Sequence, residues 1–369
     1  KKVSDGNDYD PMYLRWVIPV INSGIRGSVA NAIVFQYCHL EGALEIFESI
    51  KQEYPHIPLL TEIDDNILSI GTGNEAFDAF SPASQTRRRV ISQIRQSDGL
   101  IVSTPYLKEI YSEFNQNIWV VPNCIDFKQW GALRRKKKRG IRIGWAGGAA
   151  HEEDFEIVQN AIKNVCKFHP DVKFIFINGP AKNGLPEFFR GIPQIEHRVM
   201  WEPVLRYPQM LANLGLDIGL APLKDSAFNR GKSNLKWLEF SALGIPTVTS
   251  KVGHYEQTLS PGVDCLMADN DREIDFENAL RRLIEDRKLR VKIGSQAYNS
   301  ARKNFNVDVV SKHYIKCLEE AIEKKKVSAA LPAEVVKDEQ GSNQDSGLGI
   351  RQRQESNTLF SDPVQHGYQ

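Results

Sequence analysis

The feature that most constrains the fold is an alternation of short apolar runs with segments of helical spacing along a chain of 369 residues. Apolar runs bounded by turn residues predict buried strands, and apolar residues three and four positions apart predict helices that cover them. In the first half the predicted strands are NAIVFQYC, IPLLTEIDD, GLIVSTP and IWVVPN, at 31–38, 57–65, 99–105 and 118–123. Strands that alternate with helices form a parallel sheet with helices on both faces. The sequence therefore predicts an α/β fold.

The same alternation starts again in the second half. The predicted strands there are IRIGWAG, VKFIFING, LDIGLAPL and IPTVTS, at 141–147, 172–179, 216–223 and 245–250. We therefore expect two Rossmann-like domains, at 1–127 and 141–305, facing a cleft. The opening stretch does not give a clean strand and helix, so we expect the first domain to begin upstream of Lys1. From 327 to 369 the chain has few large apolar residues, which predicts a disordered tail.

Composition excludes several classes of function. The formal net charge of +1 gives no drive toward nucleic acid. Five scattered cysteines without a CxxC spacing argue against a zinc site and indicate a reducing, cytoplasmic location. No apolar run approaches the roughly 18 residues that a transmembrane helix needs, which leaves only peripheral contact with a membrane open.

A basic run, KQWGALRRKKKRG, interrupts the pattern at 128–140. A nuclear signal or a phosphate-binding patch would explain it, but a solvated interdomain linker is the simpler interpretation, because like charges repel and extend the chain. We therefore predict that 128–140 is a linker.

Two places in the second half suit an anion, because ligands of open α/β sheets lie beyond the carboxyl ends of the strands. The first is the turn GWAGGAAHEEDF, where Gly147 and Gly148 would let the backbone approach a phosphate closely. A tight turn without a ligand remains the alternative. His151 follows this turn and either points at the cleft or lies on the surface.

The second place is the stretch FNRGKSNLKWLEFSALGIPTV at 228–248, where a polar loop leads into a helix predicted to begin near Ser233 as its N-cap. Lys232 and Lys236 would lie at the helix start, where cations oppose the helix dipole unless an anion is bound. Glu239 follows on the same face and could accept hydrogen bonds from a ribose diol. The alternative is a Lys236–Glu239 pair on a solvated face.

In the first half, TEIDDNI brings Asp64 and Asp65 to the end of a predicted strand. This pair resembles the metal-binding acidic pair of single-domain (GT-A) glycosyltransferases, an interpretation that we reject because a second Rossmann unit carries its own phosphate site. Asp64 or Asp65 would instead orient the acceptor hydroxyl or the donor sugar, or Asp65 or Asn66 would cap a helix. His39 also ends a predicted strand and could touch substrate.

Taken together, these motifs resemble the GT-B glycosyltransferases, especially retaining enzymes of the family-four type. The resemblance runs from about Ile33 to Lys325 and includes VVPNCID, STPYLKEIY, IGWAGGAAHEEDF, FNRGKS and ALGIPTVTSKVGHYEQTLSPGVDCLMA. It implies an acceptor-side first domain, a nucleotide-sugar-binding second domain, and a C-terminal helix, 306–326, that packs back on the first domain.

The resemblance also implies roles for residues. Glu239 matches the second glutamate of a pair spaced eight apart, which contacts the ribose, whereas Gly231 stands where the sugar-binding first glutamate is expected. Met200 or Trp201 would contact the nucleobase, with core or surface packing as the alternative for Trp201. The predicted catalytic residues are Lys232, Glu239, Asp64 and Asp65. The predicted donor-binding residues are Gly147, Gly148, His151, Arg230, Lys232, Ser233, Lys236, Glu239 and Trp201.

The function predicted from this resemblance is transfer of a sugar from a nucleotide-diphosphate-sugar donor to an unidentified acceptor hydroxyl, in polysaccharide or glycoconjugate synthesis. We expect retention at the anomeric carbon, no metal, and no cofactor besides the donor substrate. Two alternatives share the fold: a sugar-nucleotide 2-epimerase, and a non-catalytic nucleotide-sugar-binding module, which Gly231 in place of glutamate would favour.

Overall fold

The structure is a computed structural model that describes residues 30–330, apart from 38–39, 75, 149–150, 178–183, 201 and 204. The predictions for the start of the first domain, for His39 and Trp201, and for the tail beyond residue 330 lie outside these residues. Among the described residues, no helix is both long and apolar enough to cross a membrane.

The first half contains a four-stranded parallel sheet in the order β1-β2-β3-β4. Its strands are β1 (Ile33–Gln36), β2 (Leu59–Ile63), β3 (Gly99–Val102) and β4 (Ile118–Val120). Each strand is added at the same edge of the sheet, and right-handed crossovers in one direction place their helices on one face. These connections contain α2 (Ala43–Glu53), η2 (Ile67–Ser69), α3 (Phe77–Phe80), α4 (Gln85–Gln96) and α5 (Pro105–Tyr111).

Alternate residues of the central strands belong to two separate hydrophobic cores, one on each face of the sheet. Leu100 and Val102 pack toward α4 and α5, whereas Leu60 and Ile101 pack with Cys317 on the other face. The period of two in a strand sends neighbouring side chains to opposite faces, so both faces of this sheet need a cover.

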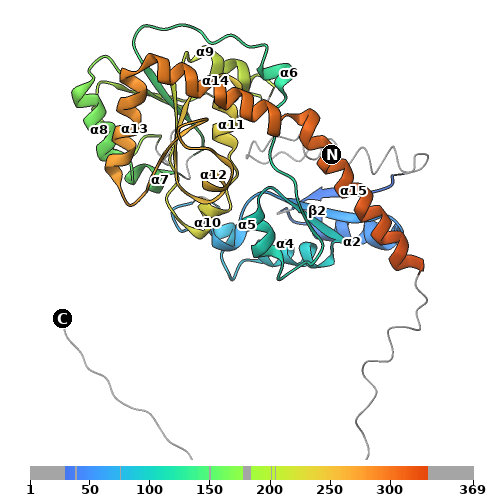
Figure 1. The fold of residues 1–369 in the computed structure, drawn as a ribbon. Coiled ribbons are helices and arrows are strands. Elements are labelled where there is room, and N and C mark those ends of the chain that lie inside the picture. The colour runs from blue at the N-terminus through green and yellow to red at the C-terminus, as the bar shows by residue number, and fades with distance from the viewer. Residues whose placement is uncertain are drawn as a thin grey trace, which may run out of the picture. The chain divides into compact units, whose positions relative to one another are not determined.

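The long C-terminal helix α15 (Val307–Ala330) covers the second face and lies beside β2 in Figure 1. Polar contacts fix it at the edges of the apolar cluster: Trp119 Nε1 donates to Glu320 at 2.8 Å, and Lys325 pairs with Asp98 at 2.7 Å. The helix runs beyond the predicted end at residue 326, because it remains helical through Ala330.

The second half contains a six-stranded parallel sheet in the order β10-β9-β8-β5-β6-β7. Its strands are β5 (Arg142–Ala146), β6 (Lys173–Ile177), β7 (Ile195–Arg198), β8 (Ile218–Ala221), β9 (Thr247–Ser250) and β10 (Leu266–Ala268). Renumbered from β5, this is the order 3-2-1-4-5-6 of dinucleotide-binding folds, with its switch point between β5 and β8.

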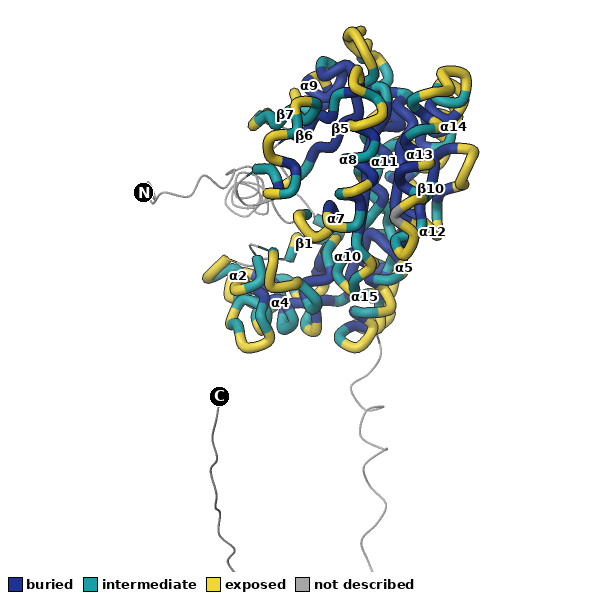
Figure 2. Tube along the Cα trace, turned by 90° about the vertical axis from the view of Figure 1, so that its left-hand side faces the viewer, coloured by how far each residue is buried: buried dark blue, intermediate teal, exposed yellow. Residues whose placement is uncertain are grey.

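Helices cover both faces of this sheet and bury its central strands (Figure 2). One core lies against α9 (Tyr207–Asn213), α11 (Leu235–Ala242), α12 (Gly253–Thr258) and α14 (Arg287–Asn304). The other lies against α7 (Glu152–Glu156), α8 (Gln159–Phe168), η3 (Glu187–Phe189) and α13 (Glu273–Glu285). Short α10 (Ala227–Arg230) belongs to the loop after β8.

Two strands of this sheet, β7 and β10, were not predicted from the sequence. β7 (IEHR) carries charged side chains at the sheet edge and β10 (LMA) has only three residues, so neither gives the long apolar run that predicts a buried strand. The predicted linker is also partly ordered, since α6 (Phe127–Trp130) buries Phe127 and Trp130.

The chain passes between the two halves in two adjacent segments. Ile125 N donates to Phe305 O at 2.9 Å, and Val307 N donates to Ile125 O at 3.0 Å. These backbone bonds join the connection after β4 to the start of α15, so both crossings form one short parallel bridge.

Candidate functional site

A cavity of about 260 Å³ lies at the switch point of the second sheet, beyond the carboxyl ends of β5 and β8. Open α/β sheets bind ligands at this position because the loops diverge there. Its lining comes from both halves of the chain and consists of Asp64, Asp65, Asn123, Ala146, Gly147, His151, Tyr207, Leu223, Lys232, Ser233, Leu235, Lys236, Glu239 and Tyr255.

Lys236 crosses the floor of this cavity from the first turn of α11. Its Nζ donates to Ala146 O at 2.9 Å and lies 4.9 Å from the Trp145 ring centroid. A Cβ at Gly147 would come within 2.8 Å of that Nζ and 2.7 Å of the Trp145 ring. Burial lowers the pKa of Lys236. Glycine at 147 therefore makes room for a desolvated ammonium at the end of β5.

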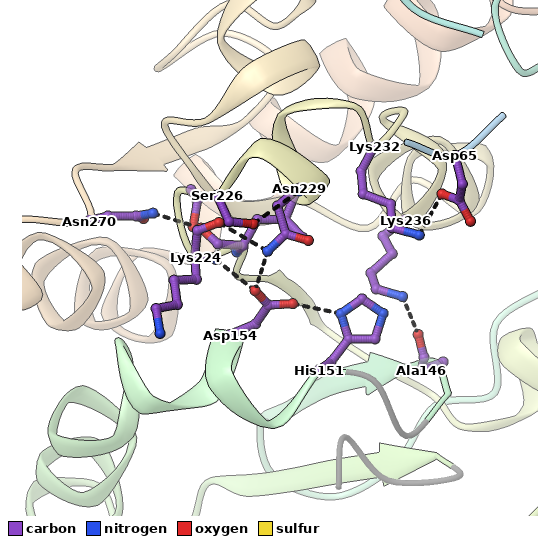
Figure 3. Close-up of polar contacts among 12 residues, drawn as sticks. Asp65, Ala146, His151, Asp154, Lys224, Ser226, Asn229, Lys232, Lys236 and Asn270 are labelled. Carbon is purple, nitrogen blue, oxygen red and sulfur yellow. Dashed lines mark hydrogen bonds and ion pairs between the residues drawn. The ribbon is translucent and has the colours of Figure 1, made fainter. Parts of the chain in front are cut away.

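Lys232 approaches the cavity from the loop before α11. Its Nζ lies 2.7 Å from Asp65 Oδ1 and 4.4 Å from the Phe228 ring centroid. The ion pair joins the two halves of the chain across the cavity (Figure 3). The two ammonium groups thus meet one cavity from different directions, an arrangement suited to a ligand with more than one anionic group.

Glu239 lies one turn after Lys236 on the same helix. The hydroxyl of Tyr207 donates to Glu239 Oε2 at 3.0 Å. Burial raises the pKa of Glu239 to about 7, against the opposing effects of Lys236 and of the Tyr207 hydrogen bond. Lys236 and Glu239 both line the cavity, so they do not form the solvated surface pair that was the alternative. Glu239 offers a carboxylate that can accept hydrogen bonds from ligand hydroxyls.

His151 precedes α7 and lines the cavity. Its Nδ1 lies 2.6 Å from Asp154 Oδ2, and its ring packs edge-on to Trp145 with centroids 5.5 Å apart. Burial lowers the pKa of His151, and the Asp154 carboxylate opposes this effect. Of the two interpretations of His151, the structure supports the one that points it at the cleft.

From the first half, Asp64 and Asp65 follow β2 and line the cavity. Burial and the neighbouring Asp65 raise the pKa of Asp64, while Lys232 lowers it. The predicted capping alternative also applies to this loop, where Asn66 caps η2 by accepting from Leu68 N at 3.2 Å. The described residues contain no cluster of three or more His, Cys, Asp or Glu that could hold a metal ion.

Three predicted donor-site residues lie differently from their expected roles. Ser233 is not the N-cap of α11, because the helix starts at Leu235 after Asn234; its Oγ instead accepts from Asn123 Nδ2 at 2.8 Å. Lys232 therefore lies in the loop, and only Lys236 occupies the first helical turn. Arg230 forms an exposed ion pair with Asp225 and does not line the cavity.

Gly148 is exposed and also lies outside the cavity lining. Trp201 is outside the described residues, and Met200 is partly buried against the core of the second half.

Gly231 is buried where the two halves meet. A Cβ there would lie 3.0 Å from Leu107 Cδ2 and 3.2 Å from Asn66 Cβ. Gly231 O also accepts from Thr104 Oγ1 at 3.3 Å. The position at which the resemblance implies a sugar-binding glutamate is therefore used for contact with the first half, which a longer side chain would disturb.

Sequence reasoning missed several residues of the site. Tyr207, Tyr255 and Asn123 line the cavity, and Asp154 holds His151 from behind. The three-residue spacing of His151 and Asp154 at the start of a helix was a usable signal. No local pattern marks Tyr207, which meets Glu239 only through the packing of α9 beside α11.

Several known proteins are similar to this chain in sequence or in fold. Residues 198–315 match the family described as glycosyl transferase-like. The chain is 26% identical over 243 residues to a putative teichuronic acid biosynthesis glycosyltransferase, TuaH, of Bacillus subtilis strain 168, covering 60% of this chain and 57% of that protein. It is 25% identical over 270 residues to a D-inositol 3-phosphate glycosyltransferase of Corynebacterium kroppenstedtii, covering 66% of this chain and 58% of that one.

Among solved structures, Anabaena HepE in complex with UDP-glucose superposes with a TM-score of 0.57 at 16% identity, covering 79% of each chain. The fold is therefore the GT-B fold of glycosyltransferases. In sequence, this chain is similar to the named glycosyltransferases that it matches. It spans less than two thirds of the length of the two curated relatives, 57% and 58%.

Proposed function

We propose that this protein is a glycosyltransferase that uses a nucleotide-diphosphate-sugar donor. The observation that carries the proposal is the convergence of Lys232, Lys236 and Glu239 on one cavity at the switch point of the second sheet. In this assignment, the lysines hold the diphosphate and Glu239 accepts hydrogen bonds from the ribose. The similarity to named glycosyltransferases supports the same assignment.

The chemistry follows from charge. As the anomeric C–O bond breaks, negative charge accumulates on the departing diphosphate, and preorganised cations stabilise it. Lys232 and Lys236 supply those cations in the proposed mechanism, so no metal is required. Asp64 and Asp65, on the opposite wall, would orient the acceptor hydroxyl or the donor sugar. The resemblance to retaining enzymes supports retention of the anomeric configuration.

The binding test is calorimetry with UDP, GDP and ADP on the wild type and Lys232→Ala. A charged hydrogen bond contributes roughly 1.5–3 kcal/mol, so the best-binding nucleotide should bind about tenfold to a hundredfold more weakly to the variant. Lys128→Ala, which removes a lysine with 79% side-chain exposure on α6, is the matched control and should bind like the wild type. Equal affinities of Lys232→Ala and wild type would refute the site.

The catalytic test uses a donor that binds, with and without an acceptor. A transferase releases nucleoside diphosphate faster when the acceptor is present, whereas an epimerase interconverts sugar nucleotides without it. Turnover should persist in EDTA. Complete loss of turnover in EDTA, restored by Mn²⁺, would contradict the lysine-based mechanism.

We also propose that the protein acts in the cytoplasm on cell-surface polysaccharide or glycoconjugate precursors. The name of the Bacillus relative supports a polysaccharide role. The described cysteines Cys124, Cys166, Cys265 and Cys317 are free, which fits a reducing compartment.

A further inference from the structure

We propose that His151 takes up a proton when a nucleoside diphosphate binds and so becomes a third cation on the phosphates, with Asp154 as the positioning residue that favours this protonated form. The inference rests on the diphosphate site of the proposed function. The proton comes from solvent and joins Nε2 of the imidazole, and no other bond forms or breaks.

The placement of the imidazole supports this role. His151 lines the same cavity as Lys232 and Lys236, and in Figure 3 the ring nitrogen away from Asp154 turns toward the Lys236 ammonium. The Trp145 ring packs against the imidazole edge and limits its rotation. A phosphate held by Lys236 would therefore lie on the Nε2 side of His151.

Asp154 fixes which nitrogen can accept the new proton. An ionised carboxylate only accepts hydrogen bonds, so the 2.6 Å contact between His151 Nδ1 and Asp154 Oδ2 requires the hydrogen to be on Nδ1. In the neutral ring, Nε2 then carries the lone pair. This nitrogen cannot donate to a phosphate until it is protonated.

The Asp154 carboxylate is held in this orientation by its other oxygen. Oδ1 accepts from Lys224 N at 2.7 Å and from Asn229 Nδ2 at 2.7 Å. Asp154 is only 2% exposed, so a buried, fully hydrogen-bonded carboxylate faces the imidazole (Figure 3). Such a partner stabilises an imidazolium more than a solvated carboxylate would, because little water screens the pair.

The charges on both sides of the imidazole determine whether the ring binds the proton in the free and in the ligand-bound protein. Asp154, in the first turn of α7, raises the pKa of His151, while Lys236 on α11 and Lys232 in the loop before α11 lower it, and burial lowers it most. Without a ligand these effects favour the neutral ring at neutral pH. A bound diphosphate compensates both lysines and adds negative charge beside Nε2, so the pKa of His151 rises on binding.

For catalysis, the consequence is a hydrogen bond from His151 to the phosphate that strengthens as the leaving group departs. An imidazolium Nε2–H can donate to a phosphate oxygen, and this bond becomes stronger as negative charge builds there.

The test is calorimetric titration with UDP at pH 7.5 in buffers of different ionisation enthalpy, which counts protons taken up on binding. The wild type should take up more protons than His151→Gln, by an amount that approaches one. Protons of the UDP phosphates and of Glu239, which lines the same cavity, contribute to both titrations and cancel in the difference. The difference should shrink as the pH falls through the pKa of His151 in the free protein, because the ring is then protonated before UDP arrives.

The variant Asp154→Asn tests whether Asp154 acts by orienting the His151 ring or only by supporting the fold. The asparagine amide would donate to Nδ1 and so place the hydrogen on Nε2, the opposite tautomer. We expect this variant to bind UDP within about tenfold of the wild type, a loss in the range of a hydrogen bond to a charged group, yet to lose the extra proton. If its thermal melt shows that it is unfolded, the comparison of wild type with His151→Gln decides alone.

The outcomes separate the two proposals. UDP binding with equal proton uptake by wild type and His151→Gln would overturn this inference and leave the proposed function standing. If UDP does not bind, inorganic pyrophosphate replaces it as the ligand in the same comparison. Failure of the wild type to bind UDP, GDP, ADP and pyrophosphate alike would overturn both.

Discussion

At the scale of single residues, the site depends on ionisable groups held at unusual protonation equilibria. Glu239 shows this most clearly, because burial raises its pKa from an ordinary 4.5 to about 7. A raised carboxyl pKa means that the folded protein prefers the protonated form. The stability from this preference is fully present below about pH 4.5 and is lost as the pH rises through about 7.

We therefore predict that Glu239→Gln has a higher melting temperature than the wild type, and that this difference grows as the pH rises through this range. Glutamine keeps a carbonyl that can accept from Tyr207 but cannot become charged, so it avoids the cost of burying a carboxylate. Melting curves of both proteins from pH 4.5 to 8 measure the difference. Glu319→Gln, on the exposed side of α15, is the control, and its melting temperature should not diverge from that of the wild type over this pH range. A melting difference for Glu239→Gln that is independent of pH would contradict the assignment.

The sequence predicted many of these residues because they lie in local motifs. Lys232, Lys236 and Glu239 share a loop and helix, and Gly147 and His151 share a turn, so spacing alone brought each group together. The prediction of Ser233 as the N-cap of α11 was wrong, and Arg230 lies outside the cavity lining. α11 starts later than the N-cap preference of serine suggested, and Asp225 pairs with the Arg230 guanidinium outside the cavity.

At the scale of elements, the order of strands in the first sheet explains the position of α15. Strands added in one direction leave one face uncovered by their crossover helices, and the cluster of Leu60, Ile101, Cys317 and Ala321 closes that face. The nearly continuous apolar runs of β2 and β3 predict that both faces are buried, but only the tertiary structure shows which helix covers each. The short edge strands β7 and β10 could not be predicted, since their pairing comes from the sheet and not from their own residues.

We predict that Ala321→Arg destabilises the protein strongly. Ala321 is 3% exposed against the first sheet, and a large charged side chain there would overpack the cluster and bury a charge without a partner. The cost should be several kcal/mol, visible as a large fall in melting temperature. Glu319→Arg introduces the same side chain on the exposed face of α15 and should melt within a few degrees of the wild type. Equal melting temperatures of the two variants would show that this cluster does not hold α15 against the sheet.

A second prediction at this scale concerns the end of α15. Truncation after Ala330 should leave melting and UDP binding unchanged, because it removes nothing from the cluster that holds the helix. Truncation from Asn306 should unfold or aggregate the protein, since it removes Cys317 and Ala321 and exposes Leu60 and Ile101. Thermal melts of the two truncated chains test both statements, and a large loss of melting temperature in the longer chain would contradict the first.

At the scale of the whole molecule, the two halves contact each other around the cavity through a few polar bonds. Asn66 Nδ2 donates to Ala227 O at 3.1 Å, and Asn123 Nδ2 donates to Ser233 Oγ at 2.8 Å. The ion pair of Lys232 with Asp65 belongs to this set. A diphosphate that binds Lys232 must therefore compete with a carboxylate of the first half.

We predict from this competition that Asp65→Asn binds UDP more tightly than the wild type. The Lys232 and Asp65 side chains are 26% and 32% exposed, so water screens part of their attraction. A partly exposed pair contributes up to about 1 kcal/mol, which corresponds to a gain of up to about fivefold in affinity. Turnover should fall in the same variant if Asp65 orients the acceptor or the donor sugar, which separates affinity from catalysis.

A double-mutant cycle tests whether the gain acts through Lys232. In the Lys232→Ala background, Asp65→Asn should no longer improve UDP binding, because the ammonium that it would release is absent. The gain in the single variant should also shrink as salt rises, since both charges are partly exposed. If Asp65→Asn instead weakens UDP binding in the wild-type background, the Asp65 carboxylate contacts the ligand directly. The Lys232–Asp65 ion pair would then persist when UDP is bound, and the ligand would not displace it.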